Sequence, residues 1–210
     1  MRFLGMVLVA WCLGLTACGS EFDEPTAACA QSCAGCCSGD KCFDGTGIEA
    51  CGAGGAICDR CEGLEDCADR GEAGRSCYFD RSERWRIQPV SAVIAPINPI
   101  GDEEWDIDGS APDVVVELEC PAGDKDIKTR TPEGSGYTPT WTEGGCTTTR
   151  GDLADRSIYI EVFDVDVTID DVMFSERYLL KAEDFRSGTF SIALPEQEKG
   201  VVRFTLTRSP

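Results

Sequence analysis

The sequence predicts an all-β protein in two parts, a small disulfide-rich module followed by a larger β domain. Ten cysteines lie between Cys29 and Cys77, in a stretch rich in glycine and almost without large aliphatic side chains. From Trp85 onward cysteines are rare and β-branched residues are frequent. The run IYIEVF, which begins at Ile158, alternates β-branched with aromatic or charged residues, as in a strand with one buried face.

The composition bounds the size and the chemistry of the protein. A chain of 210 residues is long enough for one or two domains with a core of ordinary size. The 38 acidic against 19 basic residues give a net charge of −19, which argues against nucleic-acid binding. Because there is no histidine, Ser-His and Cys-His catalysis and His-ligated metals are excluded, and we expect no enzyme.

The first 18 residues have the pattern of an export signal. A short charged start at Arg2 precedes an apolar run that is too short to span a bilayer comfortably. The ending Leu15-Thr16-Ala17-Cys18 resembles a bacterial lipobox. That resemblance implies acyl chains such as palmitate on Cys18, and a lipoprotein anchored in a membrane. Gly19 rather than Asp follows the lipidated cysteine, so we expect an outer-membrane lipoprotein on the periplasmic or cell-surface side.

The next two segments are an acidic tether, 19–28, and a cysteine-rich module, 29–84. Such a segment has too few large aliphatic side chains to form a hydrophobic core, so covalent cross-links must stabilise it. Five disulfides are the simplest interpretation for an exported protein. Zinc is the alternative, since Cys33-x2-Cys36 and Cys58-x2-Cys61 have ligand spacing. The stretch from Cys36 to Cys61 also resembles a short cysteine-rich motif of exported bacterial proteins, which suggests an extracytoplasmic spacer or a module that contacts a protein partner. The sequence leaves the disulfide pairing open.

Four carboxylates follow the alternating run within eight residues: Asp164, Asp166, Asp170 and Asp171. At ~5 Å and an effective dielectric of ~20, each pair repels by up to roughly 3 kcal/mol. Such a cost makes sense if a cation lies among them, and Ca²⁺ is the natural candidate because it takes six to eight oxygen ligands. An EF-hand is excluded, since its Gly and Glu positions are occupied by Ile169 and Ser175.

The pattern instead resembles the third loop of a C2 domain, over residues 85–210. In that family Asp-x-Asp ends a strand, and another Asp and an apolar pair follow. Asp164, Asp166, Asp171 and Val172-Met173 fit this order with a spacing one residue shorter than usual. The segment Tyr137 to Glu143 and the two C-terminal runs from Gly188 and Gly200 also match the family. The resemblance implies an eight-stranded antiparallel C2-like β-sandwich in which Trp141 lies in the core.

The resemblance also implies ligands from an earlier loop, Pro96 to Pro112, and the strand after it. Asp113 begins the strand VVVELEC, although the family's Asp-Pro order is reversed here. The first-loop ligand is Asp106 or Asp108, and spacing slightly favours Asp106. Both aspartate loops then lie at the same end of the sandwich and bind Ca²⁺.

Calcium at that end implies binding to a phospholipid membrane, since the filled site is neutralised and can share coordination with a phosphate. Four apolar residues beside the aspartates could insert at the membrane or pack within the loops: Trp105, Ile107, Val167 and Ile169.

Cys120 and Cys146 are the two cysteines of this second part, and we expect a disulfide between them if their strands are neighbours. The leading hypothesis is therefore a lipoprotein whose C2-like domain binds calcium and, through it, phospholipid or a protein partner. The alternative is a structural or adhesive surface lipoprotein with a calcium-independent scaffold.

Overall fold

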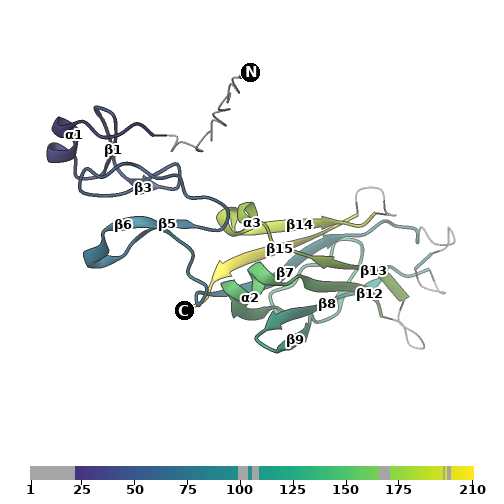
Figure 1. Ribbon diagram of the computed structural model, residues 1–210. Coiled ribbons are helices and arrows are strands. Elements are labelled where there is room, and N and C mark those ends of the chain that lie inside the picture. Colours follow the sequence, from purple (N-terminus) through teal and green to yellow (C-terminus); the bar gives the residue numbers. More distant parts are fainter. Residues whose placement is uncertain (1–21, 99–103, 106–108, 166–170, 196, 198–199) are drawn as a thin grey trace, which may run out of the picture. The chain divides into compact units, whose positions relative to one another are not determined.

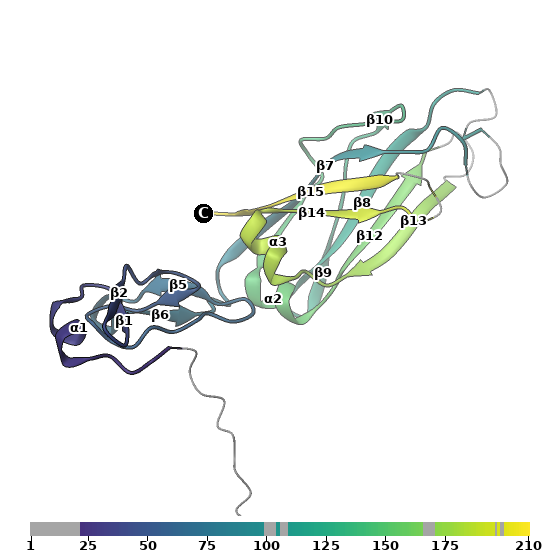
Figure 2. The ribbon, with the colours of Figure 1, turned by 90° about the horizontal axis from the view of Figure 1, so that it is seen from above.

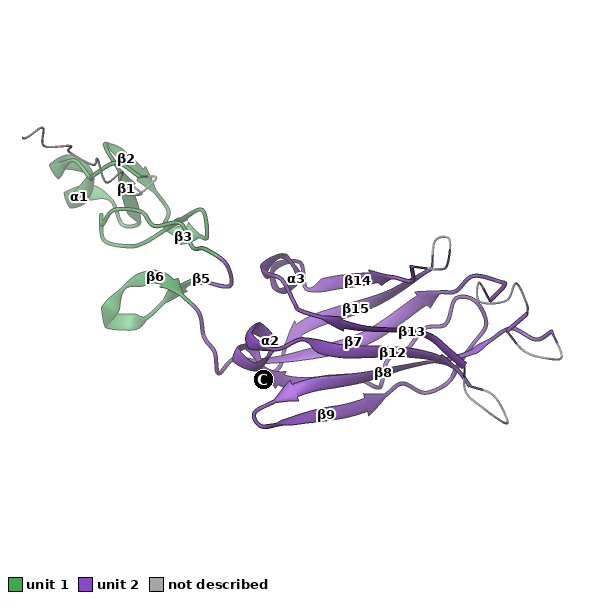
Figure 3. Ribbon diagram, turned by 45° about the vertical axis from the view of Figure 1, so that its right-hand side comes forward, with its two compact units in different colours: residues 1–62, 66–78 green, residues 63–65, 79–210 purple. Residues whose placement is uncertain are grey.

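The computed structural model describes residues 22–98, 104–105, 109–165, 171–195, 197 and 200–210. These residues form two compact units (Figure 3). Unit 1 comprises residues up to Glu62 together with Asp66–Tyr78, and unit 2 comprises Gly63–Glu65 and Phe79–Pro210. Among the described residues, no helix has both the length and the apolarity needed to cross a membrane.

Unit 1 consists of short elements. The helix α1 (Ala27–Ser32) is followed by three antiparallel pairs: β1 (Cys36–Ser38) with β2 (Lys41–Phe43), β3 (Thr46–Gly47) with β4 (Ala50–Cys51), and β5 (Asp66–Asp69) with β6 (Arg75–Tyr78). A single 3-10 turn, Gly71–Ala73, joins β5 to β6. Strands this short bury too little surface to be stable alone.

Five disulfides connect these pieces: Cys29–Cys37, Cys33–Cys42, Cys36–Cys58, Cys51–Cys67 and Cys61–Cys77. The prediction of a disulfide-rich module is thereby confirmed. The cysteines with zinc-like spacing are bonded to other partners, and the buried cluster of this unit consists of the half-cystines Cys29, Cys33 and Cys37. Covalent bonds, rather than aliphatic packing, hold unit 1 together.

The acidic segment expected to be a tether is in part docked on unit 1. The backbone of Asp23 accepts from Gly39 at 3.2 Å, and the Thr26 amide donates to the Gly39 carbonyl at 2.8 Å. Thr26 then caps α1, since its Oγ1 accepts from the amide of Cys29 at 3.3 Å. The fixed part of unit 1 therefore starts several residues before Cys29.

Unit 2 is built from two antiparallel sheets that lie one over the other (Figures 1 and 2). One sheet has the order β11-β7-β15-β14, with β7 (Arg84–Val93), β11 (Cys146–Thr149), β14 (Thr189–Ala193) and β15 (Val201–Arg208). The other contains β8 (Asp113–Ala122), β9 (Lys125–Arg130), β10 (Gly134–Ser135), β12 (Ile158–Asp164) and β13 (Asp171–Tyr178). Two short helices, α2 (Arg150–Asp155) and α3 (Ala182–Ser187), join strands.

The expected antiparallel sandwich is confirmed. In the described residues its sheets of five and four strands contain nine strands instead of the expected eight, because one edge strand is broken in two. β9 and β10 pair with successive parts of the same edge of β8. Between them Thr131 interrupts the pairing, because its Oγ1 accepts from the amide of Val116 at 3.0 Å. Together β9 and β10 act as one broken edge strand, and with this pair counted once the described sheets contain the eight expected strands.

Pro89 lies within the central strand β7 and is accommodated by a bulge. The register with β15 shifts there, since Arg203 pairs with Ser91 whereas Phe204 pairs with Pro89. Val90 is the extra residue, and its carbonyl accepts from the amide of Trp141 at 3.0 Å. A bulge of this kind lets a proline occur in a strand without loss of a ladder hydrogen bond.

The core lies between the sheets. It includes Trp85, Leu118, Ile160 and Phe204, and Trp141 is buried with them as expected. Cys120 of β8 and Cys146 of β11 form a disulfide that joins the two sheets, and both residues are buried.

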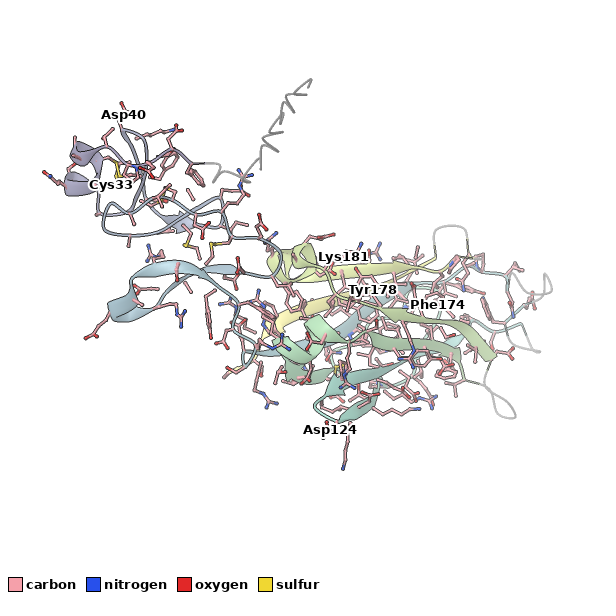
Figure 4. The ribbon with its side chains drawn as sticks, viewed as in Figure 1. Cys33, Asp40, Asp124, Phe174, Tyr178 and Lys181 are labelled. Atoms are coloured by element: carbon pink, nitrogen blue, oxygen red, sulfur yellow. A yellow bond between two sulfur atoms is a disulfide. The ribbon has the colours of Figure 1, made fainter. Side chains whose placement is uncertain are left out.

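The end of β13 is fixed by α3. The carboxylate of Asp184 accepts from the Lys181 amide at 2.8 Å and from the Tyr178 hydroxyl at 3.0 Å. Burial raises the pKa of Tyr178 to about 12, and the hydrogen bond to Asp184 is the second largest cause of this rise. Figure 4 shows Tyr178 and Lys181 at this corner. These contacts fix β13 at the end away from Asp171.

Candidate metal centre

Three of the predicted ligands lie where adjacent strands end. Asp113 is the first residue of β8, Asp164 the last of β12 and Asp171 the first of β13. In the register, Asp164 pairs with Asp171 on one side and with Val114, the neighbour of Asp113, on the other. Cross-strand partners have Cα atoms about 4.5–5.5 Å apart. The fold therefore brings these three aspartates together at the same end of three adjacent strands.

Asp164 is fully buried, with 0% of its surface exposed. It continues the inward-facing period of Ile158, Ile160 and Val162. Its Oδ1 accepts from the backbone amide of Asp113 at 2.9 Å, and the Asp113 carbonyl accepts from the amide of Val165 at 3.0 Å. Burial of a charged carboxylate costs several kcal/mol more than burial of a neutral side chain that could accept the same amide hydrogen bond. A buried charge at this position therefore indicates that another group offsets the cost.

Asp113 is held by a residue that the sequence analysis did not single out. Its Oδ1 accepts from the hydroxyl of Ser135 in β10 at 2.5 Å. This bond fixes the Asp113 side chain against the short edge strand. A serine between two glycines gives no periodic signal, so only the pairing of β10 with β8 could have identified it.

Asp171 is exposed and takes its position from the register alone. Within the described ranges, no three acidic side chains bring their carboxylate oxygens within 4.8 Å of one another. The groups that do so there are cysteines, namely Cys29, Cys33 and Cys37 in one group and Cys51, Cys61 and Cys77 in the other, and all six are in disulfides. In the described part of the site, the three carboxylates are therefore near one another but do not converge on a single point.

Several other predicted residues lie outside the described residues: the ligands Asp106, Asp108, Asp166 and Asp170, the apolar residues Ile107, Val167 and Ile169, and the lipidation site Cys18. For them the sequence-based expectations stand as predictions.

Trp105 is not an exposed membrane contact, and that prediction was wrong. Its side chain belongs to the core cluster of unit 2 and is 6% exposed. Its indole N–H donates to the carbonyl of Ala95 at 2.7 Å. A buried tryptophan whose N–H is satisfied inside the domain is a packing residue. Trp105 therefore packs inside unit 2, against the segment that follows β7, and packing was the alternative that the sequence left open.

The donor set at this end suits a hard cation. Carboxylate oxygens are the ligands that Ca²⁺ prefers, and here they come from three neighbouring strand ends, with one carboxylate already desolvated. Ca²⁺ takes six to eight oxygens, so the three described aspartates can supply only part of its shell.

The two stacked antiparallel sheets make unit 2 an antiparallel β-sandwich. Among solved structures, the chain is similar to a C2 domain with 20% identity and a TM-score of 0.42, over 61% of this chain and 99% of that one. It is also similar to a C2 domain of plant extended synaptotagmin 1, with 15% identity and a TM-score of 0.45, over 63% and 98% of the two chains.

A third similar structure contains two C2 domains of extended synaptotagmin 2 in the calcium-bound form. It shows 18% identity and a TM-score of 0.43, over 62% of this chain and 47% of that one. No family model matches the sequence, and no curated protein is significantly similar to it. Because the identities and TM-scores are low, we base the function on the residues of this chain and not on these similarities.

Proposed function

We propose that the protein is a membrane-anchored lipoprotein whose C2-like unit binds Ca²⁺ at the aspartate end and, through it, an anionic phospholipid surface. The observation that carries this proposal is the register of β8, β12 and β13. It places Asp113, Asp164 and Asp171 next to one another at the same end of these three strands. The buried carboxylate of Asp164 supports it, because a bound cation offsets the cost of that charge.

Asp113, Asp164 and Asp171 would hold the ion together with Asp166, Asp170 and either Asp106 or Asp108. When bound, Ca²⁺ supplies positive charge and free coordination positions for a lipid phosphate. The protein's part is to fix the carboxylates in place. The bond from Ser135 orients Asp113, and the amide of Asp113 orients Asp164.

The lipid anchor on Cys18 gives calcium binding a bridging role. A protein that is already tethered to the outer membrane does not need calcium to stay there. We therefore propose that the calcium-loaded end binds a second surface, or holds a protein partner at high effective concentration. We propose no catalytic activity, in keeping with a chain that lacks histidine.

We expect calcium to raise the melting temperature of the full chain in detergent by roughly 10 °C, since a ligand at about 100 times its Kd adds ~2.7 kcal/mol. Asp164→Asn should abolish this rise while it keeps an oxygen that can accept the Asp113 amide. The matched control is Asp124→Asn, which removes the same charge from the exposed turn beyond the other end of β8 (Figure 4). Scanning calorimetry with calcium or EDTA measures both variants, and an undiminished rise for Asp164→Asn would contradict the proposal.

The bridging role predicts that vesicles carrying the anchored full chain capture a second population of fluorescent vesicles. Capture should need both Ca²⁺ and phosphatidylglycerol in the second population, and EDTA should reverse it. Second vesicles made of phosphatidylcholine alone should remain free, as should all second vesicles when the protein carries Asp164→Asn. Capture that persists in EDTA would instead support a calcium-independent adhesive role.

That adhesive role is the second candidate, and the architecture of unit 1 favours it. Five disulfides fix the three hairpins of unit 1. A hollow of about 470 Å³ lies between the segment that follows β4 and the start of β6, and its lining includes Gly52, Ile57, Asp59 and Arg75. In this alternative unit 1 contacts the protein partner and the sandwich serves as a scaffold.

A further inference from the structure

The four-stranded sheet of unit 2 differs in charge from the rest of this acidic chain. The chain has 38 acidic and 19 basic residues. Yet β7, β11, β14 and β15 contain no aspartate or glutamate, and their charged residues are Arg84, Arg86, Arg203 and Arg208. One whole sheet is thus free of negative side chains.

Three of these arginines lie on the outer face of the sheet. The inner face is marked by Trp85, Ile87, Phe204 and Leu206, which belong to the core. Alternation along the strands places Arg84 and Arg86 of β7 and Arg203 of β15 on the opposite, outer face. Figure 2 looks onto this face of the sheet.

Hydroxyl groups surround the arginines. In the register, Arg203 lies between Ser91 of β7 and Ser191 of β14, Thr205 pairs with Thr189, and Arg86 lies between Thr147 of β11 and Thr207 of β15. These groups can donate and accept hydrogen bonds on the same surface.

The arginines are not engaged by carboxylates of the described residues. Arg84 and Arg203 form no ion pair there, and Arg86 donates to the amide oxygen of Gln88 at 2.7 Å. The outer face of the other sheet is different. There Lys128 lies 2.6 Å from Glu117 and 3.6 Å from Glu119. The contrast leaves the arginine face with positive charge to share with a ligand.

The surface is hollowed beside Arg203. A depression of about 420 Å³ is lined by Val90, Thr189, Phe190, Ser191, Arg203, Phe204 and Thr205. Its size is within the range of small-ligand sites. Its polar groups are three hydroxyls and one guanidinium, and a guanidinium can bind a carboxylate or phosphate through two parallel hydrogen bonds.

We propose that the outer face of β7, β15 and β14 binds an anionic saccharide chain. The serine and threonine hydroxyls can form hydrogen bonds with the hydroxyls of sugar rings. The arginines can pair with carboxylate or phosphate groups along the saccharide. None of the large apolar side chains exposed in the described residues lies on these four strands, so the face lacks side chains that insert into a bilayer.

The spacing of the arginines defines the length of the ligand. Arg86 pairs with Thr207, four residues from Arg203 on β15, which places the two arginines about 13 Å apart along the strands. A single sugar in the depression reaches only Arg203, whereas an oligosaccharide along the strands reaches both. The site needs no calcium and lies on a face of opposite charge to the aspartate end, so it goes beyond the function proposed above.

The test measures binding of a galacturonate hexamer to the full chain by calorimetry, in EDTA and at low salt. EDTA prevents calcium from linking the sugar to the aspartates, so this result is independent of the calcium proposal. We expect Arg203→Gln to weaken binding about tenfold, as for the loss of one charge-assisted hydrogen bond at a partly solvated site. Thr189→Val, which removes a hydroxyl and keeps the branched shape, should weaken it less.

The matched control is Arg177→Gln, which removes an arginine from an exposed position of β13 on the other sheet and should leave the affinity unchanged. The methyl ester of the hexamer keeps its hydroxyls but not its charge, and should bind far more weakly than the acid. No binding of the hexamer, or equal binding by Arg203→Gln, would overturn the proposal. So would loss of phosphatidylglycerol-vesicle binding in Arg203→Gln without any binding of the hexamer, which would assign the face to a lipid surface.

Discussion

Reduction of the disulfides is expected to unfold unit 1 completely while the sheets of unit 2 remain folded. Unit 1 buries a cluster of half-cystines rather than aliphatic side chains, and its strands have two to four residues. Without the bridges, little apolar burial is left to offset the conformational entropy of the chain.

The size of this effect follows from the loops that the bridges close. The paired cysteines are 8, 9, 22, 16 and 16 residues apart. Loops of this length each stabilise by about 2.5 to 3.5 kcal/mol through the entropy of the unfolded chain. Two such contributions already reach the lower end of the total stability of a typical domain, ~5 kcal/mol.

Hydrogen exchange followed by mass spectrometry measures this directly, with and without a phosphine reductant. Amides of unit 1 should lose all protection on reduction, whereas those of β8, β12 and β15 should keep theirs. EDTA alone should change nothing in unit 1, because disulfides and not zinc join its cysteines. Protection that survives full reduction would show that other contacts stabilise unit 1.

The fold was largely predictable because its signals are local. The alternation from Ile158 to Phe163 gives β12, and the spacing of cysteines gives unit 1. The pairing of the ten cysteines is a different matter, since it depends on which turns bring them together. Pro89 by itself argues against a strand at β7, because the bulge that accommodates it depends on pairing with β15, more than a hundred residues later.

The candidate site was predictable as a set of residues but not as a geometry. Aspartates at strand ends are visible in the sequence, whereas the burial of Asp164 depends on the inward period of β12 and on the amide of Asp113. Trp105 was misassigned because an apolar residue beside aspartates has the same pattern whether it points to a membrane or to Ala95.

The overall composition gives no sign of the arginine face, which is the outer face of β7 and β15 with Arg84, Arg86 and Arg203. A net charge of −19 describes the average of the chain, and the arginines that share the face are far apart in sequence, with Arg84 and Arg86 near the start of unit 2 and Arg203 near its end. Only the pairing of β7 with β15 brings them onto one surface. Charge patterning that is read along the chain therefore misses a patch built across a sheet.

Arg150→Ala is expected to destabilise unit 2 by about 3–5 kcal/mol, the range for loss of one partner from a buried ion pair. Arg150 is the first residue of α2 and is 3% exposed. Its guanidinium lies 3.3 Å from Glu83 and within about 6 Å of three rings, Phe79 at 5.3 Å, Trp85 at 5.8 Å and Phe185 at 5.3 Å. The substitution leaves a cavity among the rings and removes a cation from their faces.

Denaturant unfolding followed by tryptophan fluorescence measures this loss in unit 2 alone, since the described tryptophans, Trp85, Trp105 and Trp141, all lie in its core. Arg156→Ala is the control. It is the residue after α2 and pairs with Asp126 at 3.2 Å, but its side chain is 41% exposed, so its loss should cost at most about 1 kcal/mol. A double-mutant cycle with Glu83→Gln separates the ion pair from the ring contacts.

Glu83 also pairs with Arg208 at 3.0 Å and accepts from the indole of Trp85 at 2.8 Å. Arg150→Lys should therefore recover the charge attraction to Glu83 but not the flat contact with the rings, and should lie between wild type and alanine. If Arg150→Ala costs no more than Arg156→Ala, the prediction is contradicted, and the other contacts of Glu83 hold the segment before β7, among them the bond from the Arg150 amide to the Glu83 carbonyl at 2.7 Å.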